Sequence, residues 1–517
     1  MSTTTLSCRS PASWAPLPGL ALTAAAALLF ALPASASTEI LTPCRIKGIE
    51  REVRCGTLQV PEDPDRPDGR KIPIHFAVVP ALAKNKAPDP LFVLAGGPGQ
   101  AATRVAMLMQ PTLTRLNARR DIIYIDQRGT GRSNALACER GRMPRRLAES
   151  TDPTRAVEQL DACVKQAAER ADTRQYATWI AVRDFDAVRA AIGAERINLW
   201  GGSYGTRAAL EYLRQYPQRV RSVVLDGVAP AAMALPASLA LDAERALQAL
   251  VEACAADTGC RTHYPQLEAD LTQVLAQAAR GVRVSASHPL TGESETLKLD
   301  RTVLAGMLRS PLYAPQLASL LPFALAQAGR GNYDPLFAMS AAFGGRMAEN
   351  FAELMHFAVV CAEDMPRIDA AARDAAAATR FGTGFIELYE RACSQVPVRA
   401  VPPAFYTAPS ADVPVLVLSG GADPVTPPRH GDAIATTLPR ALHLVAPHLG
   451  HGVSQHGCAP DLIARFVRQA DGAGRAPFDG LEGGTQGGKD GGKNAEPACL
   501  QRLPAPPAFR PPAFITP

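Results

Sequence analysis

The sequence predicts an α/β fold with a mostly parallel central sheet, helices on both faces and a helical lid inserted late in the chain. Three observations lead to this prediction. Near-continuous apolar runs at 90–95, 121–126 and 197–201 are typical of strands buried on both faces, and each leads into a glycine-rich turn. A helical pattern at 178–192 separates two of these runs, and such alternation favours crossover connections between parallel strands. Residues 229–410 are instead rich in Ala and Leu at helical spacing.

The first 36 residues have the pattern of a secretory signal peptide. Arg9 precedes an apolar run at 20–32, and Ala34-Ser35-Ala36 offers the small residues that favour cleavage after Ala36. An uncleaved N-terminal anchor is the alternative, although the run is short for a membrane span. No later stretch reaches spanning length. We therefore expect a secreted or periplasmic protein with no stable membrane span after cleavage.

Composition and charge are those of an ordinary globular chain. The 517 residues are 47% hydrophobic and 20% charged, and 54 basic against 49 acidic residues give a net charge of +5. Because the charges are balanced and no dense Lys/Arg run occurs, we expect no nucleic-acid partner. No strand leads into a Gly-x-Gly-x-x-G turn and there is no phosphate loop, so we expect no cofactor.

Cysteine usage agrees with export. Loss of Cys8 with the signal peptide leaves ten of the 11 cysteines, an even number that favours five disulfides in an oxidising compartment. The sequence leaves the connectivity open, but proximity in the chain suggests Cys44–Cys55, Cys138–Cys163, Cys254–Cys260, Cys361–Cys393 and Cys458–Cys499. No Cys-x-x-Cys and no zinc-like His/Cys spacing is present, so we expect no metal site.

The remaining elements follow in chain order. Runs at 55–61 and 72–79, separated by a Pro/Gly/Asp-rich turn, suggest a hairpin before the first buried strand. Further strand signals occur at 220–228, 413–419 and 441–445. The expected segments are a signal peptide at 1–36, the first part of the core at 37–228, the lid at 229–410, the second part of the core at 411–470, a flexible Gly-rich segment at 471–498 and a Pro-rich tail at 499–517.

The stretch 197–206 contains the candidate nucleophile. An apolar run leads into Gly-Gly-Ser-Tyr-Gly at 201–205, and a helical run follows at once. Strand, sharp turn and helix around Gly-x-Ser-x-Gly is the context of a nucleophile elbow, in which Ser203 stands exposed at the top of the sheet. The flanking glycines leave room for strand and helix to cross closely.

A serine hydroxyl needs a base and a carboxylate that orients the base. In the elbow architecture the chain order is Ser, then acid, then His, on loops after later strands. Asp423 follows the strand run at 413–419, and His451 lies between Gly450 and Gly452 after the next strand run. These two residues therefore fit the order best. The less well placed alternatives are Asp412, Asp432, His448 and His456.

The tetrahedral intermediate of acyl transfer needs two N–H donors. We expect one from the backbone of Tyr204, directly after the nucleophile. The other is expected from the Gly-Gly-Pro-Gly turn at 96–99, most plausibly from Gly97. The alternative for Gly97 is a tight turn with no catalytic role.

Four motifs together resemble one family: Gly-Gly-Pro-Gly at 96–99, Asp-Gln-Arg-Gly-Thr-Gly-Arg-Ser at 126–133, Gly-Gly-Ser-Tyr-Gly-Thr at 201–206 and Gly-Ala-Asp-Pro-Val-Thr-Pro at 421–427. They are similar to the secreted α/β-hydrolases related to prolyl aminopeptidase and to the Streptomyces-type tripeptidyl aminopeptidases. The similarity runs from about residue 40 to 505. One departure is Ala95, where that family usually has His before the glycine turn. The stretch 126–133 is interpreted as a structural brace beside the elbow.

The resemblance implies an α/β-hydrolase fold and a serine aminopeptidase. Such an enzyme releases one to three residues from short peptides with a free N-terminus through an acyl-enzyme on Ser203. It needs an anionic site for the substrate ammonium, for which we expect Glu363 or Asp364 in the lid; a solvated acid at a helix end is the alternative. Because fold and triad do not specify amide over ester, a carboxylesterase or lipase-like enzyme is the alternative function. A non-enzymatic binding protein is disfavoured by the intact Ser203, Asp423 and His451.

Overall fold

The central sheet of the computed structural model has nine strands in the order β1-β2-β3-β5-β4-β6-β7-β10-β11 within the described residues, which are 40–138, 147, 153–289, 291–348, 351–470, 498–505 and 509. The strands are β1 (Leu41–Cys44), β2 (Val53–Pro61), β3 (Lys71–Val79), β4 (Leu91–Leu94), β5 (Ile122–Ile125), β6 (Ile197–Gly202), β7 (Val220–Asp226), β10 (Val415–Gly420) and β11 (Ala441–Ala446). The predicted signal peptide at 1–36 and the residues 471–497 of the Gly-rich segment lie outside the described residues.

The sheet is antiparallel at one edge and parallel elsewhere. β1, β2 and β3 pair antiparallel, and β3 joins β5 antiparallel. From β5 through β4, β6, β7 and β10 to β11 every pairing is parallel. The predicted hairpin and the predicted mostly parallel sheet are therefore confirmed. Parallel strands place their carboxyl ends, and the loops that follow, at one edge of the sheet.

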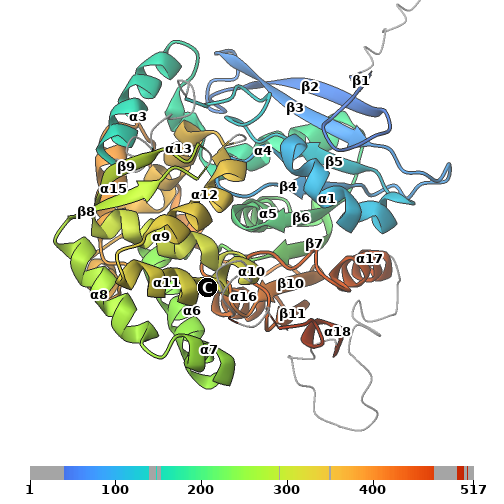
Figure 1. The fold of residues 1–517 in the computed structure, drawn as a ribbon. Helices are drawn as coiled ribbons and strands as arrows, with labels where there is room; N and C mark the ends of the chain where they lie inside the picture. The colour runs from blue at the N-terminus through green and yellow to red at the C-terminus, as the bar shows by residue number, and fades with distance from the viewer. Residues whose placement is uncertain are drawn as a thin grey trace, which may run out of the picture. The chain divides into compact units, whose positions relative to one another are not determined.

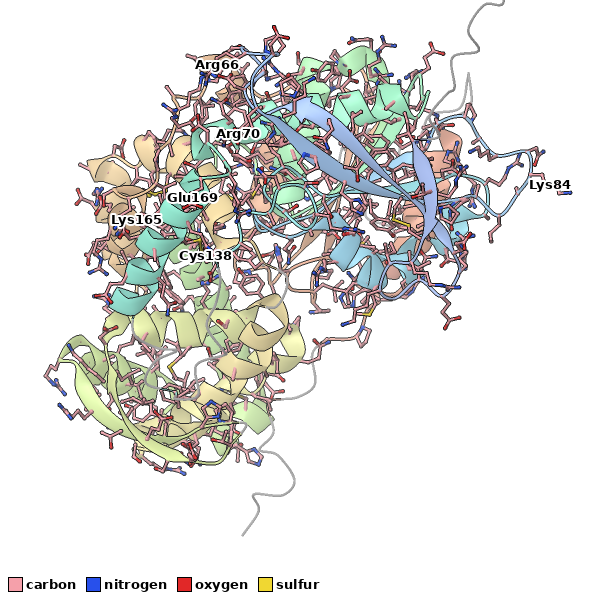
Figure 2. The ribbon with its side chains drawn as sticks, turned by 90° about the horizontal axis from the view of Figure 1, so that it is seen from above. Arg66, Arg70, Lys84, Cys138, Lys165 and Glu169 are labelled. Carbon is pink, nitrogen blue, oxygen red and sulfur yellow. A yellow bond between two sulfur atoms is a disulfide. The ribbon has the colours of Figure 1, made fainter. Side chains whose placement is uncertain are left out.

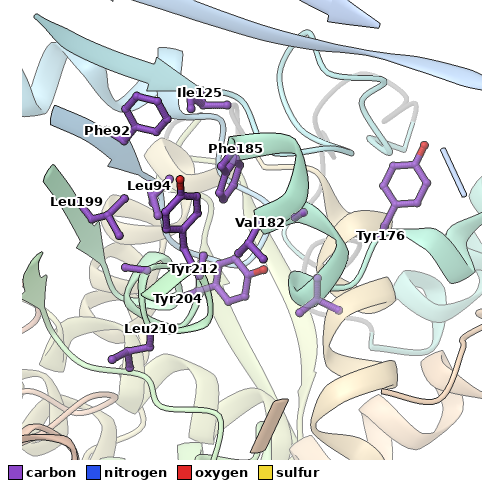
Figure 3. Close-up of a cluster of buried hydrophobic side chains, with 14 of the residues drawn as sticks. Phe92, Leu94, Ile125, Tyr176, Val182, Phe185, Leu199, Tyr204, Leu210 and Tyr212 are labelled. Carbon is purple, nitrogen blue, oxygen red and sulfur yellow. The ribbon is translucent and has the colours of Figure 1, made fainter. Parts of the chain in front are cut away.

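Helices cover both faces of the sheet, and the central strands β4, β5 and β7 are buried along their whole length. α1 (Ala102–Asn117) and α17 (Ala459–Gln469) pack with one apolar cluster of the sheet. α3 (Pro153–Ala168), α4 (Thr178–Ala191), α5 (Tyr204–Gln215) and α16 (Pro428–Ala435) pack with the other. Figure 3 shows part of this second cluster, to which Leu94, Phe185, Tyr204 and Tyr212 belong.

Most of the segment predicted to be a lid packs around a hydrophobic core of its own, whereas Leu354 and Val359 of this segment belong to a cluster of the sheet. The helices of the lid are α6 (Ala237–Ala256), α7 (Thr258–His263), α8 (Leu267–Ala279), α9 (Arg301–Leu312), α10 (Pro315–Ala318), α11 (Leu321–Gly329), α12 (Asp334–Ala348), α13 (Glu353–Glu363), α14 (Ala370–Ala377) and α15 (Gly384–Cys393). Figure 1 draws them from green to orange. The antiparallel hairpin of β8 (Val282–Ser287) and β9 (Ser294–Leu299) was not anticipated. Alternate residues of both strands are buried against the lid helices, which explains why this short segment is extended.

The short elements complete the chain. They are the 3-10 helices η1 (Thr173–Gln175), η2 (Pro217–Arg219), η3 (Met365–Arg367) and η4 (Pro403–Tyr406), and the terminal helix α18 (Ala498–Gln501). No helix within the described ranges is both long and apolar enough to cross a membrane.

All five suggested disulfides form. Cys44 pairs with Cys55, Cys138 with Cys163, Cys254 with Cys260, Cys361 with Cys393 and Cys458 with Cys499. In Figure 2, Cys138 lies beside α3, which carries its partner Cys163 and the exposed Lys165. The last of the five ties α18 back to the start of α17. Such cross-links stabilise chiefly by restricting the unfolded chain.

Candidate active site

Ser203 lies in the sharp turn between β6 and α5. Its φ is 55° and its ψ is −125°, a strained conformation for a residue with a Cβ. The Ser203 N–H donates to the carbonyl of Asp226 at the end of β7, at 2.8 Å. A Cβ on Gly205 would collide with the carbonyl of Leu94, so only glycine lets α5 cross β4 this closely. The local sequence thus builds the predicted elbow.

Asp423 and His451 come together on the loops after β10 and β11. Asp423 Oδ2 lies 2.9 Å from His451 Nδ1. The other oxygen of Asp423 accepts the N–H groups of Val425 and Thr426 at 2.8 and 2.9 Å. The Thr426 hydroxyl donates to Asp423 Oδ2 at 2.7 Å and lies 3.1 Å from His451 Nδ1. Sequence reasoning assigned no role to Thr426, although its position three residues after an acid is typical of such a local bond.

The electrostatics of this pair favour a charged acid and a basic imidazole. Burial opposes ionisation of Asp423, but His451 and the surrounding N–H donors hold the pKa of its carboxyl below the usual value. Burial also disfavours the imidazolium of His451, yet Asp423 raises the pKa of the ring above its usual value. His451 therefore becomes a stronger base than a free histidine, while Asp423 stays ionised.

Asp226 connects the elbow with the histidine loop. Its backbone carbonyl accepts from Ser203, and its carboxylate accepts the N–H groups of Val453 and Ser454, each at 2.8 Å. The Ser454 hydroxyl in turn accepts from the Trp200 indole at 3.0 Å. The loop that follows His451 is thus tied to β6 and β7, the two strands that frame the nucleophile. Sequence reasoning missed Asp226 because the partners of its carboxylate are more than 200 residues away in the chain.

Gly97 and Tyr204 are the residues expected to supply backbone N–H groups, and they lie near Ser203: Gly97 lines the same cavity, and Tyr204 follows Ser203 directly in the chain. Gly97 has a φ of 109°, and a Cβ there would lie 2.8 Å from Gly99 N, so the turn requires glycine. Tyr204 is the first residue of α5, where N–H groups have no partner within the helix. In the described part of the chain, no hydrogen bond occupies either N–H.

The stretch 126–133 braces the elbow from below. Gln127 donates to the Tyr204 hydroxyl at 2.9 Å, and Thr178 at the start of α4 lies 2.6 Å from the same hydroxyl. Arg128 is buried and donates to both carboxylate oxygens of Asp184 at 2.7 and 2.8 Å. This geometry agrees with the structural role that the sequence suggested for the stretch.

A cavity of about 640 Å³ opens over Ser203. Ser203, His451 and Gly97 all line it, together with lid residues of α9, α13 and α15. Much of the wall is apolar, including Leu235, Leu239 and Phe357. Among the described residues that line the cavity, Glu353 is the one acidic residue and Arg309 is the one arginine. This size and lining are those of a small-ligand site.

Glu363 and Asp364 do not line this cavity, which corrects the expectation that they bind a substrate ammonium. Both side chains are 0% exposed and both accept hydrogen bonds from Arg207 of α5, at 3.2 and 3.0 Å. Burial raises the pKa of Glu363 to about 7 and that of Asp364 to about 6, while Arg207 acts in the opposite direction. The C-terminal end of α13 packs against the elbow helix α5. Both carboxylates therefore pair with Arg207 in the protein interior and do not face the cavity.

The alternative residues lie elsewhere. His448 and His456 are exposed, and neither bonds to Asp423. Asp412 is an exposed residue before β10, and Asp432 lies within α16, bonded to His443. The described residues contain no group of three or more His, Cys, Asp or Glu side chains arranged for a metal ion.

Ser203 and His451 face the same cavity, but no hydrogen bond joins their side chains in the described structure. Such bonds are often long in ligand-free enzymes and tighten when substrate binds. The arrangement offers a hydroxyl and a base oriented by a carboxylate at one cavity, with the two candidate N–H donors in the glycine turn and directly after Ser203. These groups suffice for acyl transfer.

The parallel sheet with its strained serine between strand and helix defines an α/β hydrolase. Comparison with known proteins agrees. Residues 89–262 match the family model described as alpha/beta hydrolase fold, and residues 377–475 match the model described as TAP-like protein. The chain therefore belongs to the α/β hydrolases and has a TAP-like carboxyl-terminal region.

The relatives include serine peptidases. Serine protease Hip1 of Mycobacterium tuberculosis is 29% identical over 436 residues, which cover 77% of this chain and 82% of that protein. Tripeptidyl aminopeptidase of Streptomyces lividans is 27% identical over 201 residues, 35% of this chain and 36% of that protein. A solved structure of epoxide hydrolases from hot-environment metagenomes aligns at 16% identity with a TM-score of 0.35, covering 81% of this chain and 99% of that one.

Proposed function

We propose that the protein is an exported serine aminopeptidase that releases one to three residues from free peptide N-termini. The observation that carries this proposal is that the strained Ser203, Gly97 and His451 line one cavity, while the buried Asp423 bonds to His451. The similarity to serine peptidases of the TAP-like group supports peptides as substrates. The five disulfides support an oxidising compartment, in agreement with the signal-like residues 1–36.

In this mechanism His451 removes the proton of the Ser203 hydroxyl as its oxygen attacks the scissile carbonyl. The carbonyl π pair moves to oxygen, and the N–H groups of Gly97 and Tyr204 stabilise the resulting oxyanion. When the intermediate collapses, the C–N bond breaks and His451 gives its proton to the leaving amine. A water molecule, deprotonated by His451, then hydrolyses the acyl-enzyme and the proton returns to Ser203.

Glu353 is the acid that we infer to bind the substrate ammonium. It begins α13 and follows Phe351, which bridges to Gln100 of the glycine turn, so its segment lies against the reacting centre. It lines the cavity over Ser203, unlike Glu363 and Asp364. A carboxylate at the edge of a mainly apolar cavity suits a charged amine, since hydrogen bonds to ions are stronger than those between neutral groups.

Activity on substrates that differ in length and in acetylation of the N-terminus distinguishes the proposed aminopeptidase from the esterase alternative. The chain from Ser37 with its disulfides formed is assayed on p-nitroanilides of one, two and three residues, each with a free or an acetylated N-terminus, and on short p-nitrophenyl esters. We expect release only from free-amine peptides, with loss of release in Ser203→Ala. Cleavage of esters without any peptide cleavage would move the assignment to a carboxylesterase.

The Glu353→Gln variant tests the ammonium site. We expect KM for free-amine p-nitroanilides to rise about tenfold or more, because a hydrogen-bonded charge is lost. Hydrolysis of a p-nitrophenyl ester that lacks an amine serves as the internal control and should change less than twofold. An equal loss on both substrates would assign Glu353 to the fold rather than to amine binding.

A further inference from the structure

His356 of α13 reaches from the lid to the glycine turn. Its Nδ1 lies 3.1 Å from the carbonyl oxygen of Pro98, and its Nε2 lies 2.8 Å from the Tyr389 hydroxyl of α15. The side chain is largely buried, and both His356 and Tyr389 line the cavity over Ser203. The three residues therefore form a continuous polar connection between two lid helices and the turn that contains Gly97.

The chemistry of the three groups fixes the direction of each hydrogen bond. A carbonyl oxygen only accepts, so Nδ1 of His356 carries the proton and donates it to Pro98. Nε2 of the neutral ring then accepts, and the Tyr389 hydroxyl is its donor. Burial lowers the pKa of His356 to about 4 and raises the pKa of Tyr389 to about 12. Both groups therefore keep these protonation states around neutral pH.

The same lid segment holds the rest of the turn. The Ala352 N–H donates to the Gly99 carbonyl at 2.9 Å, and a Cβ on Gly97 would lie 3.1 Å from the Phe351 ring. Within the turn, the Gln100 N–H donates to the Gly96 carbonyl at 3.2 Å. The carbonyls on the peptides that follow Gly97 are thus held from outside by the start of α13.

Aromatic packing keeps the imidazole in place. The His356 ring centroid lies 5.3 Å from that of Phe351, 5.4 Å from that of Phe357 and 5.7 Å from that of Tyr389. The residue before the turn is Ala95, whose methyl group offers no hydrogen bond. The imidazole that contacts this turn is therefore the ring of His356, which lies 258 residues after Pro98 in the chain.

We propose that His356 and Tyr389 are positioning residues that fix the Gly96–Gln100 turn so that the Gly97 N–H faces the oxyanion. This inference rests on the proposed acyl transfer at Ser203. Tyr389 acts through His356: without its hydroxyl the ring is free to move its proton to Nε2, and the bond to Pro98 is lost. The relay links the helices α13 and α15 to the turn that carries the expected oxyanion donor.

The test uses four variants, purified as the full disulfide-bonded chain and assayed on the best free-amine p-nitroanilide. Tyr389→Phe removes one hydroxyl and keeps the ring. Tyr333→Phe is the matched control, because it also removes one lid hydroxyl, which bonds to Gln277 and does not line the cavity. His356→Leu removes both ring nitrogens, and His356→Asn restores a donor near the position of Nδ1.

We expect Tyr389→Phe to lower kcat about tenfold with KM within twofold, since loss of a whole oxyanion donor costs roughly 10²–10³ in kcat. His356→Leu should lower kcat about 100-fold, and His356→Asn should recover most of that loss. A peptide aldehyde, whose adduct with serine places an oxyanion in the site, should lose affinity in parallel with kcat, and unfolding temperatures report whether each variant folds.

The experiment distinguishes failure of the proposed function from failure of the positioning role. If the wild type cleaves no substrate, the proposed function fails and the positioning role fails with it. If the wild type is active and Tyr389→Phe behaves like Tyr333→Phe, only the positioning role is overturned. A rise in KM that equals the loss in kcat/KM, with no recovery in His356→Asn, would likewise assign these residues to substrate packing instead.

Discussion

Two Ser–His–Asp sets occur among the described residues, and the more completely hydrogen-bonded set is not the one over the cavity. In the second set, His443 Nδ1 lies 2.9 Å from Asp432 and His443 Nε2 lies 2.9 Å from Ser419 Oγ. The Asp423–His451 distance is the same, 2.9 Å, but no bond yet joins His451 to Ser203. Hydrogen-bond distances alone would therefore favour Ser419 over Ser203, the nucleophile that we propose.

The two serines differ in backbone conformation and in access to the cavity. Ser419 is inside β10, which is paired with β7 and β11, and its side chain is 0% exposed. A Cβ on Gly431 of α16 would approach His443 Nε2 to 2.6 Å and Ser419 Oγ to 3.0 Å, so this helix closes the set from above. Ser203 instead has a strained backbone, N–H donors beside it and a cavity in front. These features, more than the relay itself, make a nucleophile.

The largest effect is expected from matched substitutions of the two acids. Asp423→Asn should lower kcat about 10⁴-fold, because the amide favours the wrong tautomer of His451. Asp432→Asn should change kcat less than threefold, since its carboxylate is 67% exposed and remote from the cavity. Kinetics on the same peptide p-nitroanilide compare the two. A large loss in Asp432→Asn with unchanged folding would contradict the distinction.

A second effect concerns the buried Arg207–Glu363–Asp364 cluster. A carboxyl whose pKa is raised on folding stabilises the protein below its unfolded pKa, and this stabilisation is lost as pH rises through the folded pKa. With the pKa of Glu363 near 7, its contribution, on the order of 3 kcal/mol, declines between about pH 4 and pH 7. Glu363→Gln should flatten this part of the Tm–pH curve.

Measurement of KM distinguishes the internal role of Glu363 from the ammonium-binding role that the sequence analysis expected for it. Because Glu363 lies outside the cavity, Glu363→Gln should leave KM for free-amine peptides within twofold, whereas Glu353→Gln raises it. The exposed Asp412→Asn is the control for the Tm–pH curve. A rise of KM in Glu363→Gln, with an unchanged Tm–pH curve, would return this acid to the substrate site.

The smallest effect is a shift in the pH profile. Burial lowers the basicity of His451, but Asp423 outweighs it and raises the pKa of the ring above 6.5. The base must be neutral, so kcat/KM should fall as pH decreases through this pKa, with a midpoint above 6.5. Asp432→Asn should leave the midpoint unchanged. A wild-type midpoint below 6.5 would show that Asp423 does not control the active base.

The sequence was sufficient to predict the parallel strands, the elbow and the order of Ser203, Asp423 and His451. It left the disulfide connectivity open, although proximity in the chain suggested the five pairs that form. These features depend on local patterns: apolar runs, glycine turns, chain order and neighbouring cysteines. Gly205 is an example, because the close crossing of α5 over β4 needs glycine whatever the rest of the chain does. The placement of Asp423 and His451 also follows once strand order is known.

Local sequence patterns could not predict the features that depend on contacts between residues far apart in the chain. Glu363 and Arg207 are 156 residues apart, and nothing near Glu363 in the sequence signals that its carboxylate turns inward. His356 and Pro98 are 258 residues apart, and nothing near Glu353 in the sequence indicates that it lines the cavity. The hairpin of β8 and β9 forms because the lid helices cover one of its faces, although its short polar strands look weak in isolation.

The most direct measurement is labelling of the two serines with a fluorophosphonate, followed by intact mass spectrometry. Wild type, Ser203→Ala and Ser419→Ala are compared at equal concentration after their unfolding temperatures have been checked. We expect one adduct on the wild type, the same rate on Ser419→Ala and no adduct on Ser203→Ala. Undiminished labelling of Ser203→Ala, or loss of labelling in a folded Ser419→Ala, would contradict the assignment of Ser203 as the nucleophile.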